Sequence, residues 1–317
     1  MSRVRELTAP AIADRLRGPG LALDLGPVVA RLGTTLPELL DPVRLLYGGF
    51  PIADHEPLVD FEVRIEPGRM LRRWIARQGV AFVDGQRAFA PFPRAQALPM
   101  LEWAVNWCTF TRPNQYLLLH SAVVERHGRC LLLPGKPGSG KSTLTAGLVL
   151  SGWRLLSDEV AVVPPGAHHV LPVPRPVGLK DASIQAIERF DAGAVIGPRT
   201  PGTRKGTVAH LRPPDDSVAR RHEPAGPAWI VFPRFEAGAV TALRPISRPE
   251  AFLRVAHESF NYSVLGDVGF ETLAEIVDRC SCYAMRYGDL ATAIEALDDL
   301  VTDRSSRPAI AGSEAPR

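Results

Sequence analysis

The sequence predicts an α/β protein in which a larger unit with a mixed sheet follows a smaller, mostly β unit. Three observations support this class. Alternating apolar and polar residues in the first hundred positions indicate half-buried strands. A hairpin pattern over residues 117–133 predicts an antiparallel pair, so the sheet of the larger unit is mixed rather than purely parallel. Beyond this hairpin, helical and strand patterns follow one another as in α/β proteins.

The smaller unit is predicted to span residues 1–98. Leu21–Leu25 and Phe61–Ile65 alternate in polarity, and Val80–Phe89 has the pattern of a hairpin that turns at Asp84-Gly85. No residues in this unit have the spacing of a catalytic site. The proline-rich run that ends at Pro99 marks the boundary with the larger unit.

The larger unit is predicted over residues 99–302, followed by a disordered tail over residues 303–317. Its first element is a helix whose apolar residues fall on one face, namely Leu101, Ala104, Val105 and Cys108. Trp103 and Trp107 share another stripe of this helix, and we expect them in the core. Later patterns predict strands over 208–211, 228–232 and 283–287 and helices over 181–190, 247–260, 270–279 and 290–301.

Composition restricts the function classes. Hydrophobic residues make up 45% of the chain and charged ones 22%, as in an ordinary globular protein. The net charge of +3 is too small to indicate a nucleic-acid partner. No apolar run approaches the length that spans a membrane, and residues 1–16 lack the core of a signal peptide, so we expect a cytoplasmic protein without a membrane partner. The four scattered cysteines are expected to be packing residues.

A glycine-rich segment follows the apolar run Leu131–Leu133 and fits the phosphate-binding pattern G-x-x-x-x-G-K-[ST]. Its glycines allow successive backbone N–H groups to point at an anion, and the following helix adds its positive dipole end. Lys141 supplies a charge for the outer phosphates of ATP, and Ser142 a hydroxyl for Mg²⁺. The positions predicted to contact ATP are Gly135, Lys136, Pro137, Gly138, Ser139, Gly140, Lys141, Ser142 and Thr143.

Two further features suggest chemistry beside this loop. The helix over residues 141–151 ends at Gly152, and the predicted strand Trp153–Val163 carries Asp158 and Glu159. Adjacent acids at the end of an apolar strand suit magnesium binding, together with Ser142, and proton abstraction. Upstream, His120 interrupts an apolar strand, where a polar group costs free energy unless it is bonded or takes part in chemistry.

These segments resemble the catalytic half of HPr kinase/phosphorylase, in which a histidine, a P-loop and a G-x-R-L-x-x-D-D strand have similar spacings. The chain is still more similar to the HPr kinase-related proteins, which share the Ser157-Asp158-Glu159 variant and an E-W-x-x-N-W segment, here Glu102–Trp107. This resemblance implies a P-loop kinase domain with a mixed, phosphoenolpyruvate carboxykinase-like sheet. It also implies an ATP- and Mg²⁺-dependent kinase in which Lys141 and Asp158 carry the chemistry, with His120 nearby.

The segment over residues 191–227 is predicted to be a long, basic, glycine-bearing loop. Such a loop beside a kinase site is a candidate lid or substrate clamp, although it could equally be ordinary surface loop. HPr kinases have an active-site arginine in a comparable P-G-R segment, so the resemblance makes Arg204 and Lys205 candidate catalytic residues. Only four of the 37 basic residues are lysine, and they are Lys136, Lys141, Lys180 and Lys205.

The acceptor of the phosphate stays open at this point. The resemblance implies a serine hydroxyl on a small protein, either an HPr-like carrier or a ribosomally made peptide. However, the signature around Arg175 departs from the family, because Val173 stands where an acid is expected. Two other classes remain, a nucleotide-binding switch that transfers phosphate only to water and a small-molecule kinase with a carboxykinase-like fold. The resemblance also leaves a homo-oligomer open.

Overall fold

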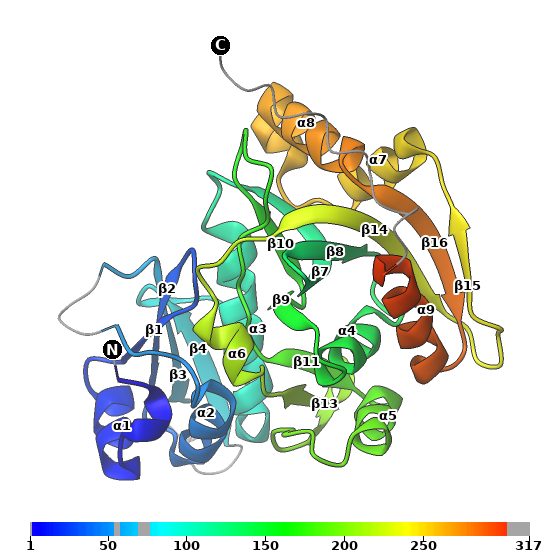
Figure 1. Cartoon of the computed structure of the whole chain (residues 1–317). Coiled ribbons are helices and arrows are strands. Elements are labelled where there is room, and N and C mark those ends of the chain that lie inside the picture. The colour runs from blue at the N-terminus through cyan, green and yellow to red at the C-terminus, as the bar shows by residue number, and fades with distance from the viewer. Residues whose placement is uncertain (1, 54–57, 69–76, 303–317) are drawn as a thin grey trace.

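The computed structural model describes residues 2–53, 58–68 and 77–302, so the predicted tail lies outside the described residues. The chain is an α/β protein with a six-stranded, a seven-stranded and a three-stranded sheet (Figure 1). No helix of the described part is both long and apolar enough to cross a membrane.

The six-stranded sheet is formed by the N-terminal residues. Its order is β1-β2-β3-β4-β5, with β6 also paired to β4. The predicted hairpin is confirmed, since Asp84 and Gly85 take the two left-handed positions of its turn, with φ of 51° and 75°. The strands are β1 (Leu21–Asp24), β2 (Val29–Thr34), β3 (Phe61–Pro67), β4 (Gln78–Val83), β5 (Gln86–Arg87) and β6 (Phe92–Pro93).

This N-terminal region is more helical than the sequence patterns predicted. Helices α1 (Ala9–Arg17) and α2 (Leu40–Tyr47) pack on its sheet through Ile12, Leu16 and Leu46. Both helices are short, and α1 has a proline at its second position, so their apolar spacing extends over only two or three turns. Short segments of this kind are difficult to distinguish from loops by periodicity alone.

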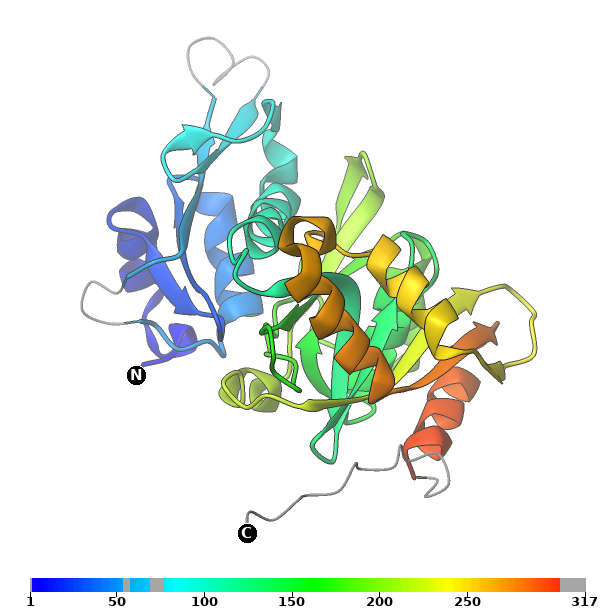
Figure 2. The same cartoon turned by 90° about the horizontal axis from the view of Figure 1, so that it is seen from above.

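Helix α3 (Ala97–Thr111) lies between the N-terminal sheet and the rest of the chain, as Figure 2 shows. Its predicted apolar face is buried, including Leu101, Val105 and Cys108. These side chains join one hydrophobic core with the N-terminal strands and with Val160 of the next sheet. The packing therefore fixes α3, including its more polar face, against the larger part of the molecule.

The seven-stranded sheet has the order β10-β7-β8-β14-β16-β15, with β9 also paired to β7. Strands β8, β14 and β16 are parallel, whereas β7 pairs antiparallel with β8, so the predicted mixed sheet is confirmed. The strands are β7 (Leu117–Arg126), β8 (Arg129–Pro134), β9 (Arg154–Ser157), β10 (Val160–Val163), β14 (Gly226–Phe235), β15 (Ala242–Pro245) and β16 (Ser281–Tyr287).

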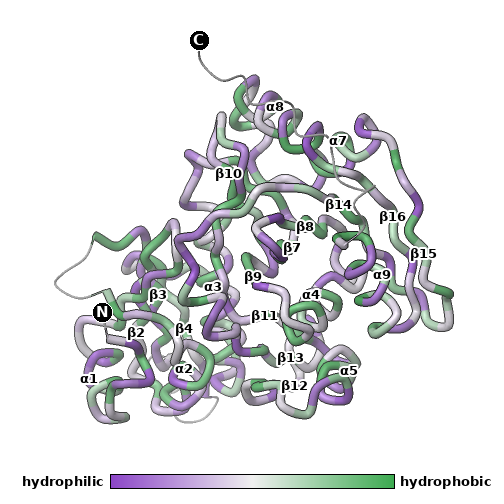
Figure 3. Tube along the Cα trace, in the orientation of Figure 1, coloured by the Kyte–Doolittle hydropathy of each residue, from purple (hydrophilic) through white to green (hydrophobic). Residues whose placement is uncertain are grey.

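Helices cover both faces of this sheet. Leu131 and Leu133 of β8 face α4 (Lys141–Leu150) and α9 (Leu290–Thr302), while Leu132 between them faces α7 (Arg248–His257) and α8 (Tyr262–Asp278). This alternation is the period of two expected for a strand buried on both sides. Hydropathy also changes along α8 in Figure 3, as expected for a helix with one face on a sheet.

Two predictions about the middle of the chain are wrong. The predicted strand 153–163 is two strands, β9 and β10, separated by the Asp158-Glu159 pair. The segment 191–227 is also not one long loop. Its predicted strand 208–211 is confirmed within β13 (Gly206–Leu211), but the segment contains a second strand, β12 (Thr200–Thr203), and the short helix α6 (Asp215–Ala219), which were not predicted. This region comprises β11 (Val177–Lys180), α5 (Ala182–Phe190), β12 (Thr200–Thr203), β13 (Gly206–Leu211) and α6 (Asp215–Ala219).

Candidate active site

The glycine-rich loop joins β8 to α4. Gly138 and Gly140 have φ of 89° and 95°, in the left-handed region that favours glycine. A Cβ at Gly140 would also lie only 2.3 Å from the Tyr287 hydroxyl oxygen. That hydroxyl donates to the Gly140 carbonyl oxygen at 3.0 Å, which fixes the loop directly before α4. Since the first N–H groups of a helix have no partner within it, the loop and α4 together present donors to an anion.

Lys141 is the first residue of α4, and its side chain is buried. Its ammonium donates to the Gly135 carbonyl oxygen and lies 3.4 Å from Nε2 of His120. Burial lowers the pKa of Lys141, while the carboxylates of Glu159 and Asp158 oppose that shift. The ammonium is thus held beside both acids, at the position where a P-loop lysine meets the outer phosphates.

His120 is brought to the site by the sheet register, because it pairs with Val160 at the start of β10. Its Nε2 lies 3.4 Å from the carboxylate of Glu159, and its Nδ1 lies 3.6 Å from that of Glu258. Together with the contact to Lys141, this places His120 within the cluster of charged groups. Its predicted proximity to the loop lysine therefore agrees with the structure.

Asp158 lies in the break between β9 and β10 and is 5% exposed. Its Oδ2 accepts from the Gly178 amide at 2.9 Å, whereas its buried Oδ1 has no hydrogen-bond partner among the described residues. Burial, and then the charge of Glu159, raise the pKa of Asp158 to about 7, although hydrogen bonding to Gly178 and Ser142 acts to lower that pKa. A carboxylate in this state can both accept a proton and ligate a cation.

Glu159 behaves in the opposite way, although it is the next residue. Burial raises its pKa, but hydrogen bonding to His120, and then the charges of His120, Lys205 and Lys141, lower the pKa overall. Two adjacent carboxyl groups with pKa values moved apart are a frequent arrangement in enzymes that transfer protons. The cluster therefore combines a carboxyl group whose pKa is lowered, Glu159, with one whose pKa is raised to about 7, Asp158.

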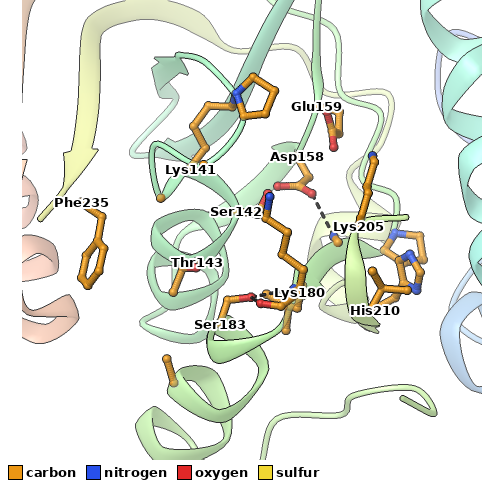
Figure 4. Close-up of a pocket in the computed structure, with 18 of the residues that line it drawn as sticks. Lys141, Ser142, Thr143, Asp158, Glu159, Lys180, Ser183, Lys205, His210 and Phe235 are labelled. Carbon is orange, nitrogen blue, oxygen red and sulfur yellow. Dashed lines mark hydrogen bonds between the residues drawn. The ribbon is translucent and has the colours of Figure 1, made fainter. Parts of the chain in front are cut away.

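These groups line one cavity of about 940 Å³ (Figure 4). All the loop positions predicted to contact ATP line it, except Gly135 and Ser139. Gly135 faces the ammonium of Lys141 with its carbonyl oxygen, and Ser139 accepts from the amide of Phe235 at 2.9 Å. Asp158 and Glu159 lie between the loop on one side and the three-stranded sheet on the other (Figure 4).

The two candidate residues of the predicted loop are separated by the structure. Arg204 and Lys205 form the turn between β12 and β13. Lys205 lines the cavity, with its ammonium 5.3 Å from the ring centroid of Trp103, whereas the exposed Arg204 does not line it. Arg204 is therefore not placed to contact groups at Asp158, and only Lys205 remains a candidate at this site.

Helix α3 forms one wall of the cavity, which the sequence patterns did not predict. Glu102 and Asn106 lie one turn apart on α3, and both bind Arg175, which precedes β11. The Asn106 Oδ1 accepts from Arg175 at 2.9 Å, and the Glu102 carboxylate also accepts from the Tyr47 hydroxyl at 3.0 Å. Trp103 is half-buried and faces the cavity, so its predicted place in the core is wrong. The spacing of Glu102 and Asn106 on one helix face was the available signal.

The donor set fits a magnesium ion that is bound mainly through a nucleotide. The described residues contain no group of three or more His, Cys, Asp or Glu side chains that could hold a metal. Mg²⁺ commonly keeps several waters and binds through one or two carboxylates and substrate phosphates. Ser142, Asp158 and Glu159 offer one hydroxyl and two carboxylates at the loop, and the unpartnered Oδ1 of Asp158 is an oxygen that a cation would satisfy.

No protein-family model matches this chain, and no curated protein is significantly similar to it in sequence. The residues and geometry of the cavity are therefore the basis for inferring a function.

Proposed function

We propose that this chain is an ATP- and Mg²⁺-dependent phosphotransferase with a P-loop kinase fold, which phosphorylates a hydroxyl group on a peptide or small protein. One observation carries the proposal. A buried carboxylate with an unpartnered oxygen, Asp158, lies in the same cavity as the P-loop Lys141 and Ser142. A nucleotide-binding switch needs no such group, since it requires no proton acceptor for a hydroxyl nucleophile.

In this scheme the loop amides and Lys141 bind the β- and γ-phosphates, and Ser142 orients the magnesium ion that accompanies the nucleotide. Bound magnesium neutralises part of the charge on the transferred phosphoryl group. Asp158 accepts the proton of the attacking hydroxyl, while Glu159 and His120 hold Lys141 in a fixed electrostatic environment. The resemblance to HPr kinase-related proteins supports these roles. We therefore include membership of that group in the proposal.

Nucleotide binding by the loop is tested first. We expect Lys141→Ala to lose on the order of 2–5 kcal/mol of MgATP affinity, because a desolvated phosphate contact loses its charge. Isothermal titration calorimetry with Mg²⁺ and a non-hydrolysable ATP analogue measures this affinity. Arg204→Ala is the matched control, since it removes an exposed cation that does not line the cavity. Equal affinity of Lys141→Ala and the wild type would contradict the phosphate site.

A further inference from the structure

The distribution of lysine in this chain coincides with the cavity. All four lysines, Lys136, Lys141, Lys180 and Lys205, line it, although they come from separate parts of the sequence. Among the described arginines, which are far more numerous, only Arg175 and Arg189 line it. Lysine presents a compact ammonium with three rotatable donors, whereas arginine presents a rigid planar fork. The cavity is therefore a region where compact positive charge is concentrated.

The four ammonium groups do not all face the same ligand. Lys136 lies in the glycine-rich loop, and Lys141 is the first residue of α4 directly after it. Figure 4 shows Lys180 beside Ser142. Lys205 lies on the other side of Asp158 and Glu159, next to His210. Three lysines thus surround the phosphate position, and Lys205 stands apart from them.

We call the region around Lys205 the acceptor compartment, which is lined by Trp103, Asn106, Arg175, Lys205 and His210. Its polar wall has unused hydrogen-bonding capacity. His210 is 5% exposed, yet its Nδ1 has no partner among the described residues, and neither does Nε of the buried Arg175. Buried polar atoms in folded proteins are nearly always bonded, so two unpaired atoms in residues that line one cavity mark a polar wall whose hydrogen bonds are incomplete. The whole cavity, about 940 Å³, is near the upper limit for a single small ligand and leaves room for a second.

Lys205 has no carboxylate partner of its own. It forms no ion pair within 4 Å with any described residue, and its nearest characterised contact is the ring of Trp103. Glu159, the acid whose pKa it lowers, is already paired with His120 at 3.4 Å. An exposed ammonium held over an aromatic ring at the rim of a site is available to a carboxylate that arrives with a ligand.

The depth of the groups defines the shape of this ligand. Both residues line the cavity, but Asp158 is buried, whereas Lys205 is exposed on a hairpin turn. A ligand that meets both must extend a hydroxyl inward and keep its anionic group at the rim. A serine side chain with an acidic residue nearby in the same peptide has this form, whereas a compact hydroxy acid carries both groups at one depth.

We propose that the acceptor compartment binds an acidic peptide and that Lys205 recognises an Asp or Glu side chain close to the phosphorylated serine. This inference rests on the proposed function. In the transfer step the serine oxygen gives its proton to Asp158 and forms the new bond to the γ-phosphorus of ATP. The bond between that phosphorus and the bridging oxygen breaks, and its electron pair leaves with ADP.

A positional-scanning library of serine peptides tests the proposal without a known substrate. Each peptide is incubated with the full-length protein, Mg²⁺ and radiolabelled ATP, and incorporation is compared between wild type, Lys205→Gln and Arg204→Gln. We expect the wild type to prefer Asp or Glu by about tenfold at one position near the serine, as for a close charge pair. Lys205→Gln should reduce that preference to less than about twofold, while Arg204→Gln, altered on the neighbouring exposed residue, should retain it.

The other outcomes overturn the inference. The peptide assignment is wrong if the wild type shows no acidic preference or if Lys205→Gln keeps it. It is also wrong if a parallel assay with glycerate as the acceptor gives labelling while no peptide is labelled. Melting temperature and MgATP titration of each protein accompany the assay. A wild type that binds MgATP but labels peptides without acidic preference refutes this inference alone, whereas a wild type that does not bind MgATP refutes the proposed function itself.

Discussion

Asp158 should make the nucleotide-free protein less stable as the pH rises. Its folded-state pKa is about 7, against an ordinary value of 3.8. A carboxyl group whose pKa is raised by folding favours the folded state fully only below the unfolded pKa, and this contribution is lost as the pH rises through the folded value. The difference between the two pKa values corresponds to at most about 4 kcal/mol, at 1.36 kcal/mol for each pKa unit.

Asp158→Asn removes this cost. Asparagine has nearly the same shape and can still accept from the Gly178 amide, which Asp158 binds at 2.9 Å. We therefore expect the variant to match the wild type near pH 4.5 and to exceed its free energy of unfolding by about 2–4 kcal/mol at pH 8. Urea unfolding at several pH values, followed by circular dichroism and by tryptophan fluorescence in EDTA, measures the difference.

Asp24 provides a control of opposite sign. Although burial raises its pKa, Arg221 and His222 at 2.6 and 2.8 Å lower the pKa overall. Such a carboxylate contributes stability above its unfolded pKa and loses it as the pH falls through the folded value. Asp24→Asn should therefore destabilise the protein at pH 7 and have less effect in acid. If Asp158→Asn gives no stabilisation that grows between pH 5 and pH 8, the assigned environment of Asp158 is wrong.

Two further predictions concern the same site. Asp158→Asn should retain MgATP binding but lose phosphate transfer to an accepted peptide by at least about two orders of magnitude, because a positioned general base contributes 10²–10⁴-fold to the rate. Radiolabel assays measure the transfer, and a near-normal rate would exclude Asp158 as the base. Gly140→Ala should abolish MgATP binding in calorimetry, since the added Cβ would lie 2.3 Å from the Tyr287 hydroxyl at a φ of 95°. The double variant with Tyr287→Phe removes the closest contact of the added Cβ but leaves Phe235 Cβ at 2.9 Å, so recovered binding would assign the effect to the hydroxyl contact. Normal binding by Gly140→Ala would contradict both causes.

The loop could be predicted from sequence because its determinants are contiguous. The glycines, Lys141 and Ser142 lie within eight positions, and the strand before them and the helix after them are local patterns. The antiparallel hairpin that makes the sheet mixed was equally local, since His127 and Gly128 form its two-residue turn with φ of 56° and 79°. Both features depend on short-range backbone preferences, which single sequences express well.

The opposite wall could not be predicted, because it is assembled by long-range pairing. Gly178, whose amide binds Asp158, is opposite His210 in the register of β11 and β13, although more than thirty residues separate them. Arg175 binds Asn106 of α3, which lies 69 residues earlier in the sequence. No local pattern encodes such contacts. The apolar run 208–211 predicted part of β13, but the glycine and proline content of residues 191–227 concealed its partner strand β12, whose Thr200 pairs with Val208.

The acid pair shows most directly what the sequence could not determine. Asp158 and Glu159 are neighbours of the same chemical type, and either could have been the proton acceptor. The two residues form the bend between β9 and β10, and their carboxylates meet different surroundings. One is buried against the Gly178 amide, and the other meets His120 and the field of Lys205. Their pKa values consequently move in opposite directions. Only the carboxyl group whose pKa is raised toward neutrality can exchange a proton at physiological pH without a large free-energy cost. The proposed role of Asp158 as the base, which the resemblance had implied, is thus supported by its position within the fold and not by residue type alone.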